Sequence, residues 1–383
     1  MSAAHQQSGD LAVIGGGAVG LAIAWRARRR GLRVTVLERG EPGAGASGVA
    51  AGMLAPVTEA AFGEDDLLAL NRESARRWPG FAADLTEASG RDPGYRRSGT
   101  LLVAPDADAA EALEREIAYR EALGLSVERL LPSAARRLEP ALAPAVRAAM
   151  HAPDDHTVDP RALTAALAAA VAAEGGEIRT GCDVAAVEVE DAVVAGVRLV
   201  GGEVVPAADV VVAAGCWSGS LAGAPFAGGS PVRPVKGQIL RLRDPAGPGL
   251  LARVLRTDDV YVVPRANGRY VVGATVEERG FDTAVTAGAI HDLLRDAAEV
   301  LPGIRELELE EASSGLRPGT PDNAPIIGPG AVAGLHWATG HHRNGILLAP
   351  ITADLIADHL AGEPLPNLAA RFAPARFATG VAA

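Results

Sequence analysis

Three glycines near the start of the chain have the spacing of a turn that binds a dinucleotide. Gly15, Gly17 and Gly20 follow an apolar segment at residues 11–14 and open a helical pattern at residues 18–30. The first glycine permits a tight turn, the second lets the backbone approach a pyrophosphate, and the third lets the helix pack closely on a sheet. Since a helix N-terminus also offers unpaired N–H groups and the positive end of a dipole, the segment predicts a phosphate site.

Glu38 completes this pattern. It ends a second apolar segment, residues 33–38, close to the spacing of about 20 residues at which a carboxylate accepts hydrogen bonds from ribose hydroxyls. An acid rather than an arginine at this position disfavours a 2′-phosphate. The strand–helix–strand unit therefore predicts FAD or NAD as the cofactor.

The elements that would position these residues are of two kinds. Strands and helices alternate towards both ends of the chain, and the apolar run at residues 208–215 is typical of a strand buried on both faces. Residues 232–275 contain β-hairpins instead, with a turn signal at residues 266–268. We therefore expect α/β segments interrupted by a separate antiparallel sheet. The remaining predictions are helices at residues 65–89, 107–122, 160–174, 287–300 and 346–360, a strand at 96–104 and a loop at 42–56.

The composition is that of an ordinary globular protein of two domains. The chain has 383 residues and a formal net charge of −11, so it lacks the surplus of Lys and Arg that nucleic acid binding needs. The apolar stretch at residues 11–25 is interrupted by glycines and falls short of the roughly 20 residues that span a bilayer, so we expect no membrane segment. Two cysteines, Cys182 and Cys216, suit a reducing compartment, and a cytoplasmic location is expected.

Four histidines are candidate metal ligands. His341 and His342 are adjacent, and His151 and His156 lie five residues apart, but no set of Cys, Asp or Glu residues completes a site around them. Loop and helix-cap positions account for all four. We predict no metal site.

Four segments together resemble the D-amino-acid oxidase family of FAD-dependent amine oxidoreductases, and within it the glycine oxidases of thiamine biosynthesis. One is the glycine unit that ends at Glu38, and the others are residues 45–54, residues 208–217, and the paired segments 315–322 and 340–350. Together they cover nearly the whole chain.

The resemblance implies an α/β fold in which a discontinuous, Rossmann-like FAD-binding domain carries a mainly antiparallel β-sheet substrate domain. The implied FAD-binding segments are residues 9–90, 145–222 and 312–375. Residues 91–144 and 223–311 would form the substrate domain.

The resemblance also implies where FAD would lie. Glu38 and Arg39 would hold the ribose of adenosine, and Val184 would meet adenine through its backbone. The helix N-terminus after Gly340 would face the pyrimidine edge of the flavin, where reduced flavin carries negative charge. Neither cysteine lies near Gly315, the region where sarcosine oxidases of this family attach flavin, so FAD is expected to bind without a covalent bond. The full set of implied cofactor-binding residues is Gly15, Gly17, Gly20, Glu38, Arg39, Ala46, Ser47, Ala51, Gly52, Met53, Val184, Trp217, Gly340, His342, Arg343, Asn344, Gly345, Ile346 and Leu347.

For the substrate, the resemblance implies a carboxylate-binding arginine at Arg317, a hydroxyl donor at Tyr261 and a second pocket arginine at Arg343. A carboxylate buried beside an apolar ring system needs a bidentate cation, which the planar fork of arginine provides. We expect Arg317 to follow a strand, with Pro318 turning the chain away. The chain departs from the glycine oxidases at Asp258 and Asp259, which either point outward or meet the ammonium group of the substrate.

The leading hypothesis is an FAD oxidase that converts glycine or another small primary or secondary amino acid to its imine, reduces O2 to H2O2, and supplies the imine for thiamine thiazole synthesis. A second hypothesis is a D-amino-acid or 2-hydroxy-acid dehydrogenase that passes electrons to a quinone or a protein. A third is a flavin-binding subunit with an inert pocket. The oligomeric state stays open, a homo-oligomer included.

Overall fold

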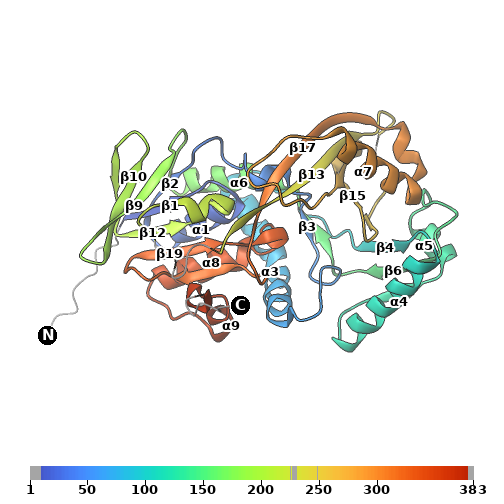
Figure 1. Ribbon diagram of the computed structural model, residues 1–383, viewed down its shortest axis with the longest axis horizontal. Coiled ribbons are helices and arrows are strands. Elements are labelled where there is room, and N and C mark those ends of the chain that lie inside the picture. The colour runs from blue at the N-terminus through green and yellow to red at the C-terminus, as the bar shows by residue number, and fades with distance from the viewer. Residues whose placement is uncertain (1–9, 225, 227–230, 248, 378–383) are drawn as a thin grey trace.

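Two large β-sheets lie along the long axis of an elongated molecule (Figure 1). The computed structural model describes residues 10–224, 226, 231–247 and 249–377. One sheet has six strands, in the spatial order β18 (Ile326–Pro329), β19 (Leu335–Thr339), β12 (Asp209–Val212), β1 (Asp10–Ile14), β2 (Arg33–Leu37) and β8 (Glu177–Arg179). The other has eight strands, in the order β17 (Glu308–Gly319), β13 (Arg233–Arg243), β16 (Arg269–Gly273), β15 (Tyr261–Pro264), β14 (Val254–Arg256), β4 (Thr100–Ala104), β6 (Ala148–Ala152) and β5 (Glu128–Leu130).

The six-stranded sheet is built on the predicted strand–helix–strand unit. Strand β1 lies between β2 and β12 and pairs with both in parallel, and α1 (Ala18–Arg29) connects β1 to β2. The three valines of β12, residues 210–212, are all buried, as the apolar run at residues 208–215 predicted. The structure confirms the Rossmann-like part of the predicted fold.

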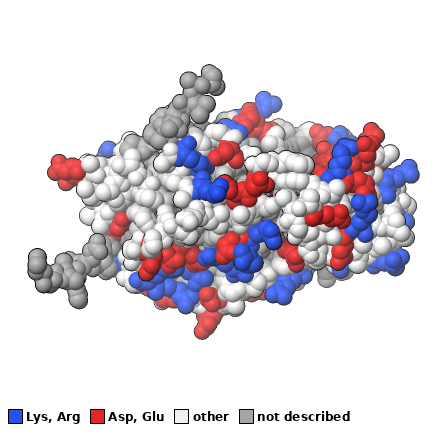
Figure 2. Space-filling view, turned by 90° about the horizontal axis from the view of Figure 1, so that it is seen from below, with Lys and Arg blue, Asp and Glu red and all other residues white. Residues whose placement is uncertain are grey.

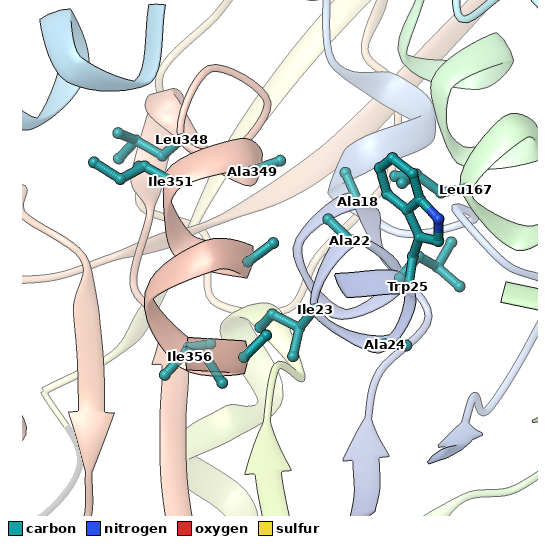
Figure 3. Close-up of a cluster of buried hydrophobic side chains, with 14 of the residues drawn as sticks. Ala18, Ala22, Ile23, Ala24, Trp25, Leu167, Leu348, Ala349, Ile351 and Ile356 are labelled. Carbon is teal, nitrogen blue, oxygen red and sulfur yellow. The ribbon is translucent and has the colours of Figure 1, made fainter. Parts of the chain in front are cut away.

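Three helices pack together over this sheet. Figure 3 shows α8 (Ala349–Leu360) beside α1, with Ile23 between them, while Trp25 on the other side of α1 meets Leu167 of α6 (Pro160–Ala173). All three side chains are fully shielded from solvent. The alanines that line α1 let the neighbouring helices approach it closely, and burial of this apolar surface is the main term that stabilises the layer.

The eight-stranded sheet confirms the predicted separate, mainly antiparallel sheet. Its neighbouring strands are antiparallel, except that β14 and β4 run parallel. Its strands come from residues 100–152 and 233–319. Strand β6 and the second half of β17 therefore belong to this sheet, although their residues fall within the FAD-binding segments that the resemblance implied. The helices on this half of the molecule are α4 (Ala107–Ala122), α5 (Pro132–Leu138) and α7 (Ala287–Val300).

Some local predictions need correction. Residues 42–56 are not only loop, because they contain α2 (Ala46–Val49) and β3 (Met53–Leu54), which pairs with β7 (His156–Thr157). The last long helix, α8, begins at Ala349 rather than residue 346, because a short 3-10 turn, η4 (His342–Asn344), comes first. Strand β4 begins at Thr100, and the sequence before it forms only an isolated bridge to β7.

The remaining elements pack on the six-stranded half of the molecule, α3 against α6 and α8, and β10 against β12. Helix α3 (Asp65–Ser89) has the predicted bounds, and the strands β9 (Val184–Glu190), β10 (Val193–Leu199) and β11 (Val204–Pro206) form a small sheet of their own. Figure 2 shows acidic and basic side chains interspersed over one face of the molecule. Among the described residues, no helix is both long enough and apolar enough to cross a membrane.

Candidate cofactor and substrate site

A cavity of about 690 Å³ lies where the two sheets meet. Its walls include the carboxyl ends of β1, β2 and β12, where ligands bind in open α/β sheets. They also include residues of β13, β15 and β17 from the eight-stranded sheet. Ligands held by the first sheet would therefore be covered by side chains of the second.

The glycine turn at the first wall requires glycine at two of its positions. Gly15 has φ +106°, and a Cβ there would lie 2.5 Å from the carbonyl oxygen of Ala213. A Cβ on Gly20 would lie 2.0 Å from the carbonyl oxygen of Gly15. Gly15 and Gly17 border the cavity, whereas Gly20 allows the helix to pack against the turn.

Glu38 fixes the shape of this wall. Its carboxylate accepts hydrogen bonds from the backbone N–H groups of Gly16 at 2.7 Å and Gly40 at 2.8 Å. Next to it, the guanidinium of Arg39 lies 4.5 Å from the ring centre of Trp217. All of Glu38, Arg39 and Trp217 line the cavity, so one end of it has an acceptor, a cation and an aromatic surface.

The segment at residues 46–53, which includes α2, lines the cavity and is tied to both halves of the molecule. The Ser47 hydroxyl accepts a hydrogen bond from the backbone N–H of Ala18, at the N-terminus of α1, at 3.0 Å. Arg241 donates to the carbonyl of Gly48 at 2.8 Å, and Arg265 donates to the carbonyl of Ala51. Since both arginines come from the eight-stranded sheet, this loop holds a fixed position between the two halves of the molecule.

Arg317 lies inside strand β17, and the prediction that it follows a strand is wrong. Pro318 and Gly319 continue the strand rather than turning away. Among the strands that the structure describes, β17 is the edge of its sheet and pairs with β13 alone, and this pairing continues through Pro318 to Gly319 despite the missing N–H.

Two strand glycines make room for the predicted substrate residues. A Cβ on Gly237 would lie 2.4 Å from the guanidinium nitrogens of Arg317, and a Cβ on Gly273 would lie 2.5 Å from the Tyr261 hydroxyl. Both side chains therefore lie flat on the backbone of a neighbouring strand. The sequence carried a signal for this arrangement, because a glycine inside a strand pattern indicates close approach of another group.

The guanidinium of Arg317 is held by carbonyl groups alone. Its Nη1 donates to the backbone oxygens of Lys236 at 3.3 Å and Thr275 at 3.1 Å. Within the described part of the chain, no carboxylate forms an ion pair with it. The partly buried Tyr261 lies in the same cavity: desolvation raises the pKa of its hydroxyl, and the charge of Arg317 opposes that rise. This corner of the cavity thus presents an unneutralised cation and a protonated hydroxyl.

Arg343, the second predicted pocket arginine, is already paired. Its Nε lies 2.8 Å from Oε2 of Glu59, whose Oε1 pairs with Arg256. Burial raises the pKa of Glu59, but the charges of Arg256 and Arg343 outweigh it and hold this pKa below its ordinary value. Sequence reasoning missed Glu59 and Arg256, since no motif marks them and 197 residues separate the pair.

The adjacent histidines at this end of the cavity are neutral at physiological pH. Burial lowers the pKa of His341 to about 3, and its Nε2 lies 3.0 Å from the hydroxyl of Thr352. Burial, followed by the charges of Arg317 and Arg343, lowers the pKa of His342 to about 4. The other two histidines lie in strands, His151 in β6 and His156 in β7, rather than in the predicted loop and cap positions. His151 lies 3.1 Å from a carboxylate oxygen of Glu128, and no group of His, Cys, Asp and Glu within the described ranges could hold a metal ion.

The structure brings most of the predicted residues to one cavity. Gly20 and Gly340 are the two that lie outside its lining, and Asp258 and Asp259 are exposed at its rim. The predicted residues that line it are Gly15, Gly17, Glu38, Arg39, Ala46, Ser47, Ala51, Gly52, Met53, Val184, Trp217, Tyr261, Arg317, His342, Arg343, Asn344, Gly345, Ile346 and Leu347.

Residues 10–359 match the family described as FAD dependent oxidoreductase (DAO). The chain belongs to this family. It is 36% identical over 351 residues to a glycine oxidase of Geobacillus kaustophilus, covering 91% of this chain and 92% of the relative. The solved structure of glycine oxidase from Geobacillus kaustophilus superposes with a TM-score of 0.88 and 34% identity, covering 96% of this chain and 98% of that one.

A longer relative matches over only part of its length. The bifunctional protein ThiO/ThiG of Trichormus variabilis is 37% identical over 371 residues, which cover 96% of this chain but 55% of the relative. The chain therefore spans about half the length of that protein.

Members of this family are FAD-dependent, and the residues present fit that cofactor. The glycine turn leaves space that a Cβ would fill, α1 begins at the cavity with its N-terminus, and Glu38 provides the acceptor at the far end. The cavity runs from there to Arg317, so the elongated FAD molecule has polar groups for its phosphates and ribose at one end and an apolar middle.

Replacing Glu38 with Arg should prevent stable FAD binding. The change removes the acceptor for two backbone N–H groups and puts a cation against them, so the variant should purify mainly without FAD. The measurement is the ratio of flavin to protein absorbance, with thermal unfolding to show that the variant folds.

Glu41→Arg is the matched control, since Glu41 is exposed and does not line this cavity. It should keep its FAD. A Glu38→Arg protein with a full complement of FAD would show that Glu38 does not bind the cofactor.

Proposed function

We propose that this enzyme oxidises glycine or another small primary or secondary amino acid to the corresponding imine. The observation that carries the proposal is the guanidinium of Arg317, which lies in the cavity of an FAD-dependent oxidoreductase with no carboxylate partner among the described residues. Arg317 is partly shielded from water, and a shielded cation without a counter-ion is costly, a cost that an incoming carboxylate reduces.

The substrate carboxylate would be held by Arg317 and Tyr261. The planar fork of Arg317 can donate two parallel hydrogen bonds to the two oxygens of a carboxylate, which fixes orientation as well as position. The raised pKa of Tyr261 keeps its hydroxyl protonated, so it can donate to one of the same oxygens. With the carboxylate fixed in this way, Cα and the amine are the parts left to face the rest of the cavity.

The chain positions the substrate, and the cofactor carries the redox chemistry. Bound in this cavity, FAD would supply the two-electron oxidation of the substrate to the imine and the reduction of O2 to H2O2. The segment at residues 46–53 packs beside the strand that bears Arg317, since a Cβ on Gly315 of that strand would lie 3.0 Å from Val49, and Arg241 and Arg265 tie the segment to the rest of the eight-stranded half. This brace keeps the distance from Cα to the reacting position short and constant, which orientation-dependent catalysis requires.

The names of the relatives support glycine as the substrate and thiamine synthesis as the context. Two relatives named glycine oxidase and ThiO/ThiG match nearly the whole of this chain. We propose that the imine is used for the thiazole of thiamine. Burial raises the pKa of Cys216 to about 12, so this cavity thiol is not a nucleophile at neutral pH, which supports non-covalent FAD.

Anaerobic reduction by glycine tests the proposal. Glycine and then sarcosine are added to the FAD-loaded protein without oxygen, and flavin absorbance is followed. We expect bleaching, and rapid recovery with release of H2O2 when air is admitted. Slow recovery that a quinone accelerates would indicate a dehydrogenase instead. Absence of bleaching with any small amino acid or 2-hydroxy acid would contradict an amino-acid oxidase.

Replacing Arg317 with Ala should weaken substrate binding. We expect KM for glycine to rise by about two orders of magnitude, which corresponds to about 3 kcal/mol of charged hydrogen bonding. An uncharged amine should lose much less, because it makes no contact with this guanidinium. Steady-state kinetics on both substrates provide the measurement. An equal rise in KM for the amine and for the amino acid would show that Arg317 does not bind the substrate carboxylate.

Replacing Gly237 with Ala should displace the guanidinium without unfolding the protein. The three atoms nearest to the new Cβ all belong to the flexible end of Arg317, so the side chain can move aside and the stability should stay near that of the wild type. We expect KM for glycine to rise about tenfold because the carboxylate partner is misplaced.

Gly303→Ala is the control for this change, because its Cβ also meets only the end of a flexible side chain, Leu250, away from the cavity. Its KM should equal that of the wild type. A normal KM in Gly237→Ala would contradict the role of this glycine.

A further inference from the structure

A second set of charges, most of which line the cavity, lies at the same end as Arg317. Glu59 pairs with Arg256 through Oε1 and with Arg343 through Oε2, and Oε2 of Glu64 lies 3.9 Å from Nη2 of Arg343. The formal charges of these two glutamates and two arginines cancel.

Glu59, Arg256 and Arg343 line the same cavity as Arg317 and the Tyr261 hydroxyl. The charges of Arg317, Glu59 and Arg256 all act on this hydroxyl. A ligand whose carboxylate reaches Arg317 and Tyr261 therefore also comes close to the Glu59 set. At this end of the cavity, and for the residues that the structure describes, Arg317 is the one guanidinium with no acidic partner.

Glu59 is held in place by its own chain neighbours. The buried carboxylate of Asp155 accepts from the backbone N–H groups of Val57 and Thr58, each at 2.9 Å. The buried guanidinium of Arg120 donates to the carbonyls of the same two residues, at 3.0 and 2.9 Å. All four polar groups of these two residues' backbone are thus satisfied by charged side chains, and the position of the next residue, Glu59, is fixed.

A fixed carboxylate between two arginines has a clear effect on a ligand. With Glu59 in place, its negative charge offsets the charges of Arg256 and Arg343, and the fixed carboxylate repels a second anion that approaches either arginine. Such an arrangement rejects one class of ligand by an unfavourable charge rather than by lack of space.

We propose that Glu59 is a specificity-determining residue, which occupies Arg256 and Arg343 so that the site accepts amino acids with a single carboxylate and rejects those that carry a second anionic group on the amine side. The inference rests on the proposed function for the reaction itself. It adds the charge class of substrate and the residue that sets it.

The test compares two substrates that differ by one carboxylate, sarcosine and iminodiacetate. In Glu59→Gln, which keeps the shape of the side chain, the ratio of kcat/KM for iminodiacetate to that for sarcosine should rise about tenfold or more, because two arginines become available to the second carboxylate. Glu64→Gln should change the ratio by about twofold or less, since Glu64 is farther from Arg343 and does not line the cavity.

A double variant shows whether the gain acts through the released arginine. In Glu59→Gln/Arg343→Met the ratio should return to within about threefold of the wild type, because the new partner of the second carboxylate is gone. An unchanged ratio in Glu59→Gln, or an equal rise in Glu64→Gln, would overturn the proposal.

Binding provides a readout that does not depend on turnover. Acetate and malonate are titrated into the FAD-loaded proteins, and the dissociation constants are read from the flavin spectrum. In Glu59→Gln, the affinity for malonate relative to that for acetate should be about tenfold higher than in the wild type. An unchanged malonate preference would overturn the inference. Failure of the wild type to oxidise glycine or sarcosine, with the malonate gain present, would defeat the proposed reaction and leave the selectivity of Glu59 standing.

Discussion

The site depends on one unneutralised cation, the guanidinium of Arg317 lying on the backbone of Gly237. Removing a charge from water costs several kcal/mol unless partners replace the solvent. The carbonyls of Lys236 and Thr275 replace some of the water around the guanidinium, and no carboxylate of the described chain pairs with it. The fold therefore holds this cation ready for an anion from outside. That is the property that distinguishes Arg317 from Arg256 and Arg343, which are neutralised within the protein.

The two sheets divide the work between them. The six-stranded sheet presents a helix N-terminus and Glu38, the groups that suit a dinucleotide, and the eight-stranded sheet presents Arg317 and Tyr261. Contacts between the two halves of the molecule fix the distance between these groups. Arg241 and Arg265 donate hydrogen bonds to the segment at residues 46–53, and Glu59 pairs with both Arg256 and Arg343. A reaction that needs donor and acceptor atoms in contact requires this kind of rigid connection.

Sequence reasoning succeeded where the signal was local. The glycine spacing, Glu38 and the apolar strands lie within short segments, and their geometry follows from turn and helix physics. It was wrong on Arg317, because an edge strand tolerates Pro318 and only the sheet order reveals the edge. It missed Glu59 and Arg256, because their pairing depends on the fold rather than on a motif. Gly237 was visible in the sequence as a strand glycine, but the side chain that fills its space lies 80 residues away in β17.

The most direct test of the central claim is calorimetric titration of the FAD-loaded protein with acetate, which has the carboxylate of glycine and no amine. The account predicts saturable binding in the wild type and a loss of about 100-fold or more in Arg317→Ala, with the flavin spectrum of the free variant unchanged. Arg317→Lys should recover only part of the affinity, since a lysine cannot donate in the bidentate geometry. Acetate binding of equal strength in the wild type and in Arg317→Ala would show that the substrate carboxylate is held elsewhere.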